Sequence, residues 1–159
     1  MKEKQIDISS EFAKAIEWTP EWSTGAPCPQ VFSNGHETYL SYYTDEAENT
    51  SVLVTFFKSL SHRFGIVNDE AANGHPLYEK GLETYRAHII ENSKWIDEHK
   101  QIHKAHPRYS DEHWKDYKHF LLFFHDEIFE VIFSGDYKIE KFNLTMKEIA
   151  IETARRLNL

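Results

Sequence analysis

The segment that most constrains the fold runs from Lys118 to Phe133 and contains FFHDEIFEVIF, the most apolar stretch of the chain. Two apolar runs flank the acidic pair Asp126-Glu127, which interrupts them as a tight turn would. Asp tolerates turn conformations well, whereas Glu is a poorer turn former. The pattern predicts a β-hairpin with these two residues at the centre of its turn.

Side chains alternate between the faces of a strand, so the expected hairpin has one apolar and one mixed face. The apolar face, which we expect to be core, consists of Phe120, Leu122, Phe124, Phe129, Val131 and Phe133. The mixed face combines His119, Leu121, Phe123 and His125 with Ile128, Glu130 and Ile132. This register places His125 opposite Ile128 and Phe123 opposite Glu130, so that His125 and Glu130 point the same way.

A histidine and a carboxylate on one half-apolar face have a functional and a structural interpretation. In the functional interpretation, Glu130 either fixes the tautomer of His125 or has a carboxyl whose pKa is raised by burial. The two residues would then form an acid–base pair or the polar part of a ligand pocket. In the structural one, the face is partly solvated, as in many antiparallel sheets. The sequence leaves both open.

Other segments complete an α+β pattern. Residues 37–44, 50–59, 61–67, 84–92 and 137–142 are rich in β-branched and aromatic residues and predict further strands. Helices are expected over 9–18, 93–106 and 110–117, and after Thr145, which forms a capping box with Glu148. We therefore expect a single α+β domain over residues 1–159. It should contain a curved, mainly antiparallel sheet of about six or seven strands and about two to four helices, including a C-terminal one.

The composition excludes several classes of protein. The chain has 26 acidic and 18 basic residues and a formal net charge of −8, which repels a phosphate backbone, so no nucleic-acid partner is expected. Cys28 is the single cysteine, which rules out an intrachain disulfide and favours a reducing compartment. No leader-like segment opens the chain, and no stretch reaches the roughly 18 apolar residues of a membrane span. We expect a cytoplasmic protein with no membrane partner.

His99 and His103 have a spacing that can present two imidazoles of one helix to a metal ion. No Glu follows either of them, so the H-E-x-x-H pattern is absent, and His99 shares a helical stripe with Trp95 and Ile102. A core histidine is the simpler explanation, and we assign no metal and no cofactor. Cys28 has no adjacent basic group that would make it a nucleophile. Nucleotide-binding and G-x-S-x-G motifs are also absent.

Two loops add polar candidates. His75 and Tyr78 follow a Gly/Pro turn, and Glu91 and Asn92 lie where an expected strand meets an expected helix, a common position for binding groups. The structural alternative is ordinary turn chemistry, with Asn92 as a helix N-cap.

Several of these segments together resemble a family of small bacterial proteins of unknown function. The resemblance is carried by His75-Pro76-Leu77-Tyr78, Glu91-Asn92-Ser93 with Trp95, His106-Pro107, and Phe124-His125-Asp126 with Phe129-Glu130. It extends from Asn73 to about Ser134, and the chain departs from it at Glu127 and Ile128, where related chains have small residues. The resemblance implies no activity, cofactor or partner; it implies that these polar segments belong to one recurring pattern.

Three functions are compatible with these features. We expect first a non-enzymatic binding protein with an aromatic-lined pocket for a small molecule or peptide. Its candidate ligand-binding residues are His75, Tyr78, Glu91, Asn92, His119, His125 and Glu130. The alternatives are a small hydrolase or lyase that uses the His125–Glu130 pair, with or without a metal, and a protein–protein interaction module. A homo-oligomer is compatible with each of them.

Overall fold

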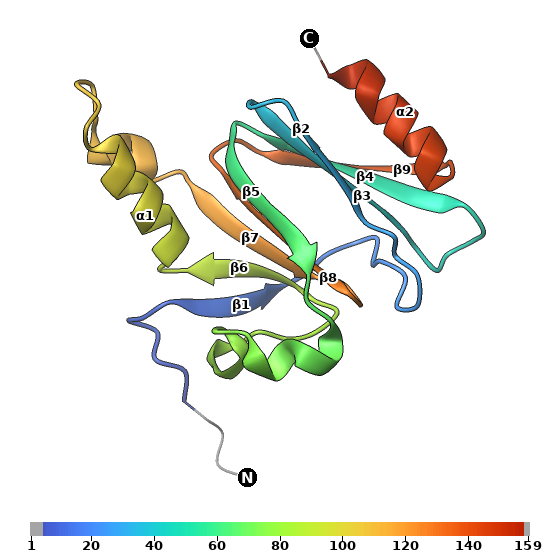
Figure 1. Ribbon diagram of the computed structural model, residues 1–159, viewed down its shortest axis with the longest axis horizontal. Helices are drawn as coiled ribbons and strands as arrows, with labels where there is room; N and C mark the ends of the chain where they lie inside the picture. Colours follow the sequence, from blue (N-terminus) through green and yellow to red (C-terminus); the bar gives the residue numbers. More distant parts are fainter. Residues whose placement is uncertain (1–4, 158–159) are drawn as a thin grey trace.

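Lys58 is the single residue between two long strands, β4 (Thr50–Phe57) and β5 (Ser59–Ile66), and it turns the chain from one sheet into another. It does so with a positive φ of 53°. In this computed structural model, which describes residues 5–157, nine strands form two antiparallel sheets (Figure 1). Corners at which a strand changes sheet are a known device for packing two sheets together.

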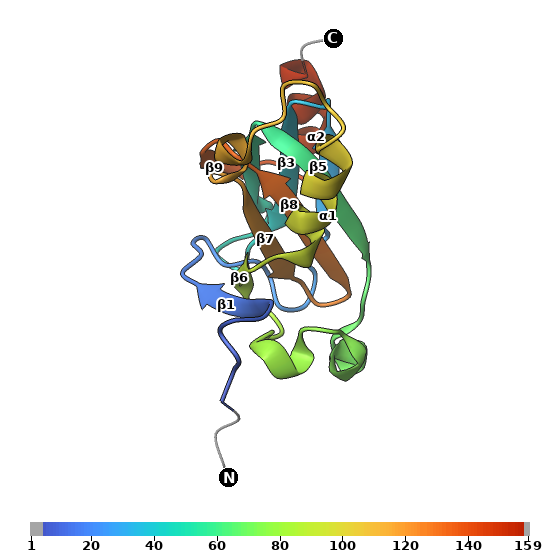
Figure 2. The same cartoon turned by 90° about the vertical axis from the view of Figure 1, so that its left-hand side faces the viewer.

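The sheets have five and four strands. The first has the order β1-β6-β7-β8-β5 and contains, besides β5, β1 (Phe12–Ile16), β6 (Ala87–Glu91), β7 (Lys118–Phe123) and β8 (Glu127–Phe133). The second has the order β2-β3-β4-β9 and contains, besides β4, β2 (Gln30–Ser33), β3 (Glu37–Tyr43) and β9 (Tyr137–Asn143). Figure 2 shows β1 and the C-terminal helix at opposite ends of the molecule.

The main core lies between the two sheets. The apolar face expected for the β7–β8 hairpin is confirmed, because all six of its side chains belong to this core. The second sheet contributes Leu40, Tyr42, Val52, Val54 and Phe56. Aromatic rings dominate the contact: Phe56 lies 5.1 Å from Phe133 and 5.7 Å from Phe129, measured between ring centroids.

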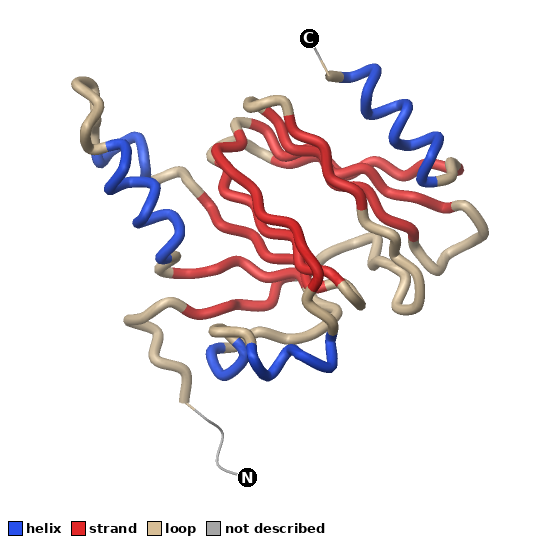
Figure 3. Tube along the Cα trace, in the orientation of Figure 1, coloured by secondary structure: helices blue, strands red, loops and turns tan. Residues whose placement is uncertain are grey.

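Helical segments cover the outer faces of the sheets (Figure 3). The 3₁₀ helices η1 (Asp69–Gly74) and η2 (Tyr78–Lys80) belong to a segment that packs on the outer face of the first sheet through Ala72, Leu77 and Leu82. The helix α1 (Lys94–His103) follows β6, and η3 (Asp111–Trp114) precedes β7. The expected C-terminal helix is confirmed as α2 (Met146–Arg156), with its Thr145–Glu148 capping box, and it packs on β3 and β4.

Two expectations about the fold were wrong. The expected single curved sheet of about six or seven strands is replaced by nine strands in two sheets, because the corner at Lys58 directs the neighbouring segments 50–59 and 61–67 into different sheets. Residues 9–18 do not form a helix: Phe12–Ile16 form β1, which pairs with β6 along its whole length. The spacing of Phe12, Ala13 and Ile16 suits either structure, and tertiary pairing decides between them.

Phe56→Ala should test how far the fold depends on the shared aromatic core. The Phe56 side chain is fully buried, so its truncation should lower the free energy of unfolding by about 3–5 kcal/mol. The matched control is Ile66→Ala at an 85 % exposed position, with an expected change of at most about 0.5 kcal/mol. Urea unfolding measures both. Equal effects of the two changes would contradict the assigned core.

Candidate functional site

Glu130 lies in β8 and projects from the outer face of the first sheet. It is paired with Leu121 of β7 and with Arg63 of β5. The expected register placed Phe123 opposite Glu130, but the structure pairs Phe123 with Ile128, so that register was wrong by one residue on each strand. The partner of each residue therefore differs by two positions from the expected one. Because side chains alternate with a period of two, each of them stays on its expected face, and the expected division into a core face and a mixed face is confirmed.

The error in register arises at the turn. His125 and Asp126 are its central residues, and Phe124 donates its N–H to the carbonyl of Glu127 at 2.9 Å. The imidazole of His125 lies beside the Asp126 carboxylate, 2.9 Å from Nδ1 to Oδ1, and this hydrogen bond raises the pKa of His125. The expected pair of His125 with Glu130 is therefore wrong, since the histidine is part of the turn.

Glu130 is hydrogen-bonded to a different histidine, His119 of β7. The Nε2–H of His119 donates to Oε1 of Glu130 at 2.9 Å, and its Nδ1 lies 2.7 Å from the hydroxyl oxygen of Ser93. His119 and Ser93 are buried, and only 13 % of the Glu130 side chain is exposed. Three polar groups from β8, β7 and the start of α1 thus form one buried hydrogen-bonded chain.

Arg63 and Trp95 flank this chain. The Arg63 guanidinium donates from Nη2 to Oε1 of Glu130 at 3.2 Å and lies 3.9 Å from the centre of the Trp95 ring. The Trp95 ring in turn meets the ring of His119 edge-on, with centroids 5.1 Å apart. Trp95 therefore shields the His119–Glu130 hydrogen bond from solvent on the side of α1.

The balance of forces on the Glu130 carboxyl favours its ionised form. Burial acts to raise its pKa, but the hydrogen bond and charge of His119 and the charge of Arg63 outweigh burial and lower the pKa. A net rise of this pKa through burial, one of the possibilities that the sequence left open, is therefore not what the structure favours. In the neutral form of His119, the ionised Glu130 carboxylate holds the ring proton on Nε2, and the other ring nitrogen, Nδ1, is then an acceptor for the hydroxyl proton of Ser93.

The position of Ser93 follows from the junction between β6 and α1. Asn92 adopts a positive φ of 53°, which Asn tolerates better than most residues, and its amide donates to the carbonyls of Ile8 and Ser10. Ser93 is then the N-cap of α1, and its hydroxyl accepts the N–H of Ile96 at 3.1 Å. Asn92 was an N-cap considered from the sequence; the structure uses the next residue, Ser93.

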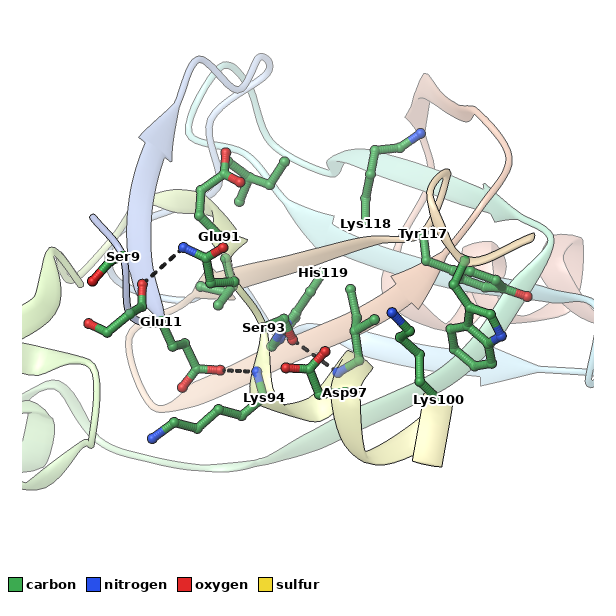
Figure 4. Close-up of a pocket in the computed structure, with 16 residues that line it drawn as sticks. Ser9, Glu11, Glu91, Ser93, Lys94, Asp97, Lys100, Tyr117, Lys118 and His119 are labelled. Atoms are coloured by element: carbon green, nitrogen blue, oxygen red, sulfur yellow. Dashed lines mark hydrogen bonds between the residues drawn. The ribbon is translucent and has the colours of Figure 1, made fainter. Parts of the chain in front are cut away.

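A cleft of roughly 680 Å³ opens beside this chain. The ladder between β6 and β7 ends at the pair Ile89–Phe120, and the two strands then diverge toward α1 (Figure 1). Figure 4 shows Ser93, His119 and Asp97 near the centre of the cleft, while Lys118 points away from them. The remaining lining residues are Ser9, Ser10, Glu11, Ile89, Ile90, Glu91, Asn92, Lys94, Ile96, Lys100, Trp114 and Tyr117.

The structure brings together some of the candidate residues and separates others. Glu91, Asn92 and His119 line the large cleft. His75 and Glu130 line a smaller cavity of about 230 Å³ next to β5, and burial lowers the pKa of His75. Tyr78 is exposed and lines neither of these cavities, and His125 lies at the hairpin turn.

Sequence reasoning did not assign site roles to Ser93, Trp95 and Arg63. Ser93 and Trp95 lie at a strand-to-helix junction, next to the candidates Glu91 and Asn92, and this position was the signal available for them. Arg63 had no such signal, because its position beside Glu130 depends on how β5 pairs with β8.

No metal centre is found among residues 5–157: no three His, Cys, Asp or Glu side chains come close enough together to hold an ion. The rings of His99 and His103 lie 6.2 Å apart, and Nδ1 of His103 donates to the carbonyl of His99 at 2.7 Å. One nitrogen of the pair is thus already engaged by the helix itself.

Glu130→Gln should make the fold less sensitive to acid. Ionised Glu130 contributes stability that is fully present above its unfolded pKa, roughly 4.3, and is lost as pH falls through its lowered folded pKa. The variant should lose about 1–3 kcal/mol of unfolding free energy near neutral pH, where the buried charged hydrogen bond is intact. Urea unfolding from pH 7 to pH 3 should show this difference shrinking.

The matched control for that series is Glu112→Gln, which removes an exposed partner of Lys115. Its effect should be small at every pH, since exposed ion pairs contribute little. A constant difference between the protein and Glu130→Gln across the whole pH range would contradict the assigned role of the carboxylate.

Comparisons with known proteins do not indicate a function for this chain. No family model, curated protein or solved structure matches the chain. In the part of the chain described, no helix has both the length and the apolar character needed to cross a membrane. The cleft, whose wall contains Ser93 and His119 of the buried Ser93–His119–Glu130 chain, is thus the feature from which a function has to be inferred.

Proposed function

We propose that this protein binds a small molecule or a short peptide in the cleft between β6, β7 and α1. The observation that supports this most directly is the cleft of roughly 680 Å³, of a size typical of ligand sites, with an ordered polar chain at its wall. Ligand sites usually combine apolar surface with a few polar groups held in fixed positions. The cleft has both.

The walls indicate the chemistry of the ligand. The aromatic side chains of Trp114 and Tyr117, whose rings lie 4.8 Å apart, stand on one side and offer a surface for an apolar or planar group. Ile89, Ile90 and Ile96 extend the apolar surface. The ligand should therefore contain an apolar portion of at least a few carbon atoms.

Charged side chains of both signs line the same cleft. Asp97 and Lys100 lie on successive turns of α1, and Glu91 lies at the end of β6. A ligand with both a cationic and an anionic or strongly polar end would find partners for each. Amino-acid derivatives and dipeptides have this combination of charge and apolar surface, and the acidic net charge of the protein disfavours polyanions.

The binding proposal is tested by ¹H–¹⁵N NMR titration with free amino acids, N-acetyl amino acid amides and dipeptides. Compounds of this set that bind, with a Kd on the order of a millimolar or tighter, should change the chemical shifts of the backbone amides of residues 89–100 and 114–119. Shifts scattered over other elements, or none with any of these compounds, would contradict the proposal.

Two tryptophan substitutions on α1 sharpen the test. Ile96 lines the cleft, so Ile96→Trp should fill part of it and weaken binding at least about tenfold, a loss of roughly 1.4 kcal/mol. Ile102 is exposed and does not line the cleft, so Ile102→Trp should leave binding unchanged. Thermal unfolding of both variants checks that each retains the fold. Equal binding by the two variants would place the ligand elsewhere.

A further inference from the structure

We propose that the cleft also carries out acyl transfer, with Ser93 as the nucleophile, His119 as its general base and Glu130 as the residue that positions the base. The substrate class is an ester of a short-chain carboxylic acid. This inference rests on the proposed function, since the ester has to occupy the same cleft. It adds a chemical step that binding alone does not require.

The geometry matches the arrangement that activates a serine. The hydroxyl oxygen of Ser93 lies 2.7 Å from Nδ1 of His119, within the range for nucleophile and base. The other ring nitrogen, Nε2, lies 2.9 Å from the Glu130 carboxylate, which orients the ring and would stabilise an imidazolium. Serine, histidine and carboxylate are therefore connected in the order that nucleophilic catalysis requires, and such groups are recognised by their geometry rather than by their order in the chain.

The hydrogen bonds of the Ser93 hydroxyl leave it able to react. With His119 neutral and its proton on Nε2, the Ser93 hydroxyl donates to Nδ1, and one lone pair of its oxygen accepts the N–H of Ile96. A second lone pair remains for attack on a carbonyl carbon. Ser93 is also the N-cap of α1, a ten-residue helix, whose positive end favours negative charge developing on the substrate oxygen.

A helix cap alone does not account for this arrangement. Capping needs only the acceptor side of a hydroxyl, as at Ser110, which accepts the N–H of Glu112 at the start of η3. At Ser93 the hydroxyl oxygen also lies at hydrogen-bond distance from a ring nitrogen of His119, a buried histidine that is held by the largely buried Glu130 carboxylate. Both Ser93 and His119 line the cleft, so these reacting groups adjoin a space that a ligand can enter.

The reaction proceeds in two balanced stages. The Ser93 oxygen attacks the ester carbonyl carbon while its proton passes to Nδ1 of His119; the carbon–oxygen bond of the ester then breaks, and the leaving alcohol takes that proton. The acyl group is now held as an ester of Ser93. Water attacks this ester, His119 accepts a proton from the water and returns it to the Ser93 oxygen, and the carboxylic acid leaves. Glu130 remains ionised throughout, so the step needs no oxidant, reductant or further reactant.

The burial of Ser93 limits the size of the acyl group. Only 6 % of the residue is exposed, so an acyl chain has to fit closely between the residue and the apolar side chains of the cleft. Acetyl and propionyl esters should therefore react faster than esters of long-chain acids. The alcohol portion can extend along the cleft toward Trp114 and Tyr117.

The experiment uses a fluorophosphonate probe and p-nitrophenyl acetate on the full chain. A fluorophosphonate forms a stable adduct with an activated serine, and peptide mass spectrometry should place that adduct on Ser93. Hydrolysis of p-nitrophenyl acetate should be saturable, and it should fall to the rate of the background reaction in Ser93→Ala. Ser110→Ala is the matched control: it removes a capping serine whose hydroxyl, among the described residues, accepts the N–H of Glu112 and is not bonded to a histidine ring, and it should retain full activity.

Ser93→Ala also removes a helix cap, so Ser93→Asn is the second variant. Asn can accept the N–H of Ile96 and keep the cap, but it has no nucleophilic hydroxyl. It should fold with a melting temperature near that of the unchanged protein and show neither adduct nor saturable hydrolysis. Saturable hydrolysis that persists in Ser93→Asn would overturn the proposal.

Glu130→Gln tests the positioning role. It should reduce the labelling rate about 100-fold or more and move the pH of half-maximal labelling, because the imidazolium loses its neighbouring negative charge. A variant that had merely lost stability would label more slowly without a change in that pH, and this outcome would remove Glu130 from the mechanism. No adduct on Ser93, or an adduct on another residue only, overturns acyl transfer altogether; NMR shifts in the cleft under those conditions would leave the binding function intact.

Discussion

The packing of aromatic and aliphatic side chains between the two sheets is the interaction on which the rest of this structure depends. One whole face of the β7–β8 hairpin is committed to it, together with the inner faces of β3 and β4. Burial of that much apolar surface is the main favourable contribution to folding of such a domain. Because the core takes every second residue of β7 and β8, the residues between them are left to point outward.

The outward-facing residues are where the polar site is built. Neighbouring positions on this face, such as Leu121 and Ile128, lie in a second apolar cluster under the segment that contains η1 and η2. Toward α1, the same face holds His119 and Glu130, and Ser93 and Trp95 complete their surroundings. A buried carboxylate is tolerated there because it is paired on two sides, with His119 and with Arg63. The rigid core thus fixes the backbone from which the polar chain projects.

Local signals were enough to predict much of the fold, and the failures have physical causes. Alternation along β7 and β8 identified the core face correctly even though the turn was misplaced by one residue. This error changes the pairing by two positions, which leaves every side chain on the same face of the sheet. The capping box of α2 was readable because it depends on residues three apart in sequence. By contrast, β1 exists because it pairs with β6, more than seventy residues away in sequence, and a local pattern cannot reveal such a pairing. The partner of Glu130 was misassigned for a related reason: the choice between His119 and His125 depends on the turn.

The corner at Lys58 connects the two sheets directly, through a single residue. The β5–β8 ladder also has an irregularity in its register between Ser59 and Ser61. The corner and this irregularity together determine which side chains of β5 point inward. One extra residue between Ser61 and His62 would invert the alternation of inward and outward side chains in the rest of β5, so that His62 would take the place of Arg63 beside Glu130. The exposed turn between β3 and β4 imposes no such condition, because added length there leaves both ladders unchanged. Added length is therefore tolerable in the turn before β4, whereas in β5, just after the irregularity, it would separate Arg63 from Glu130.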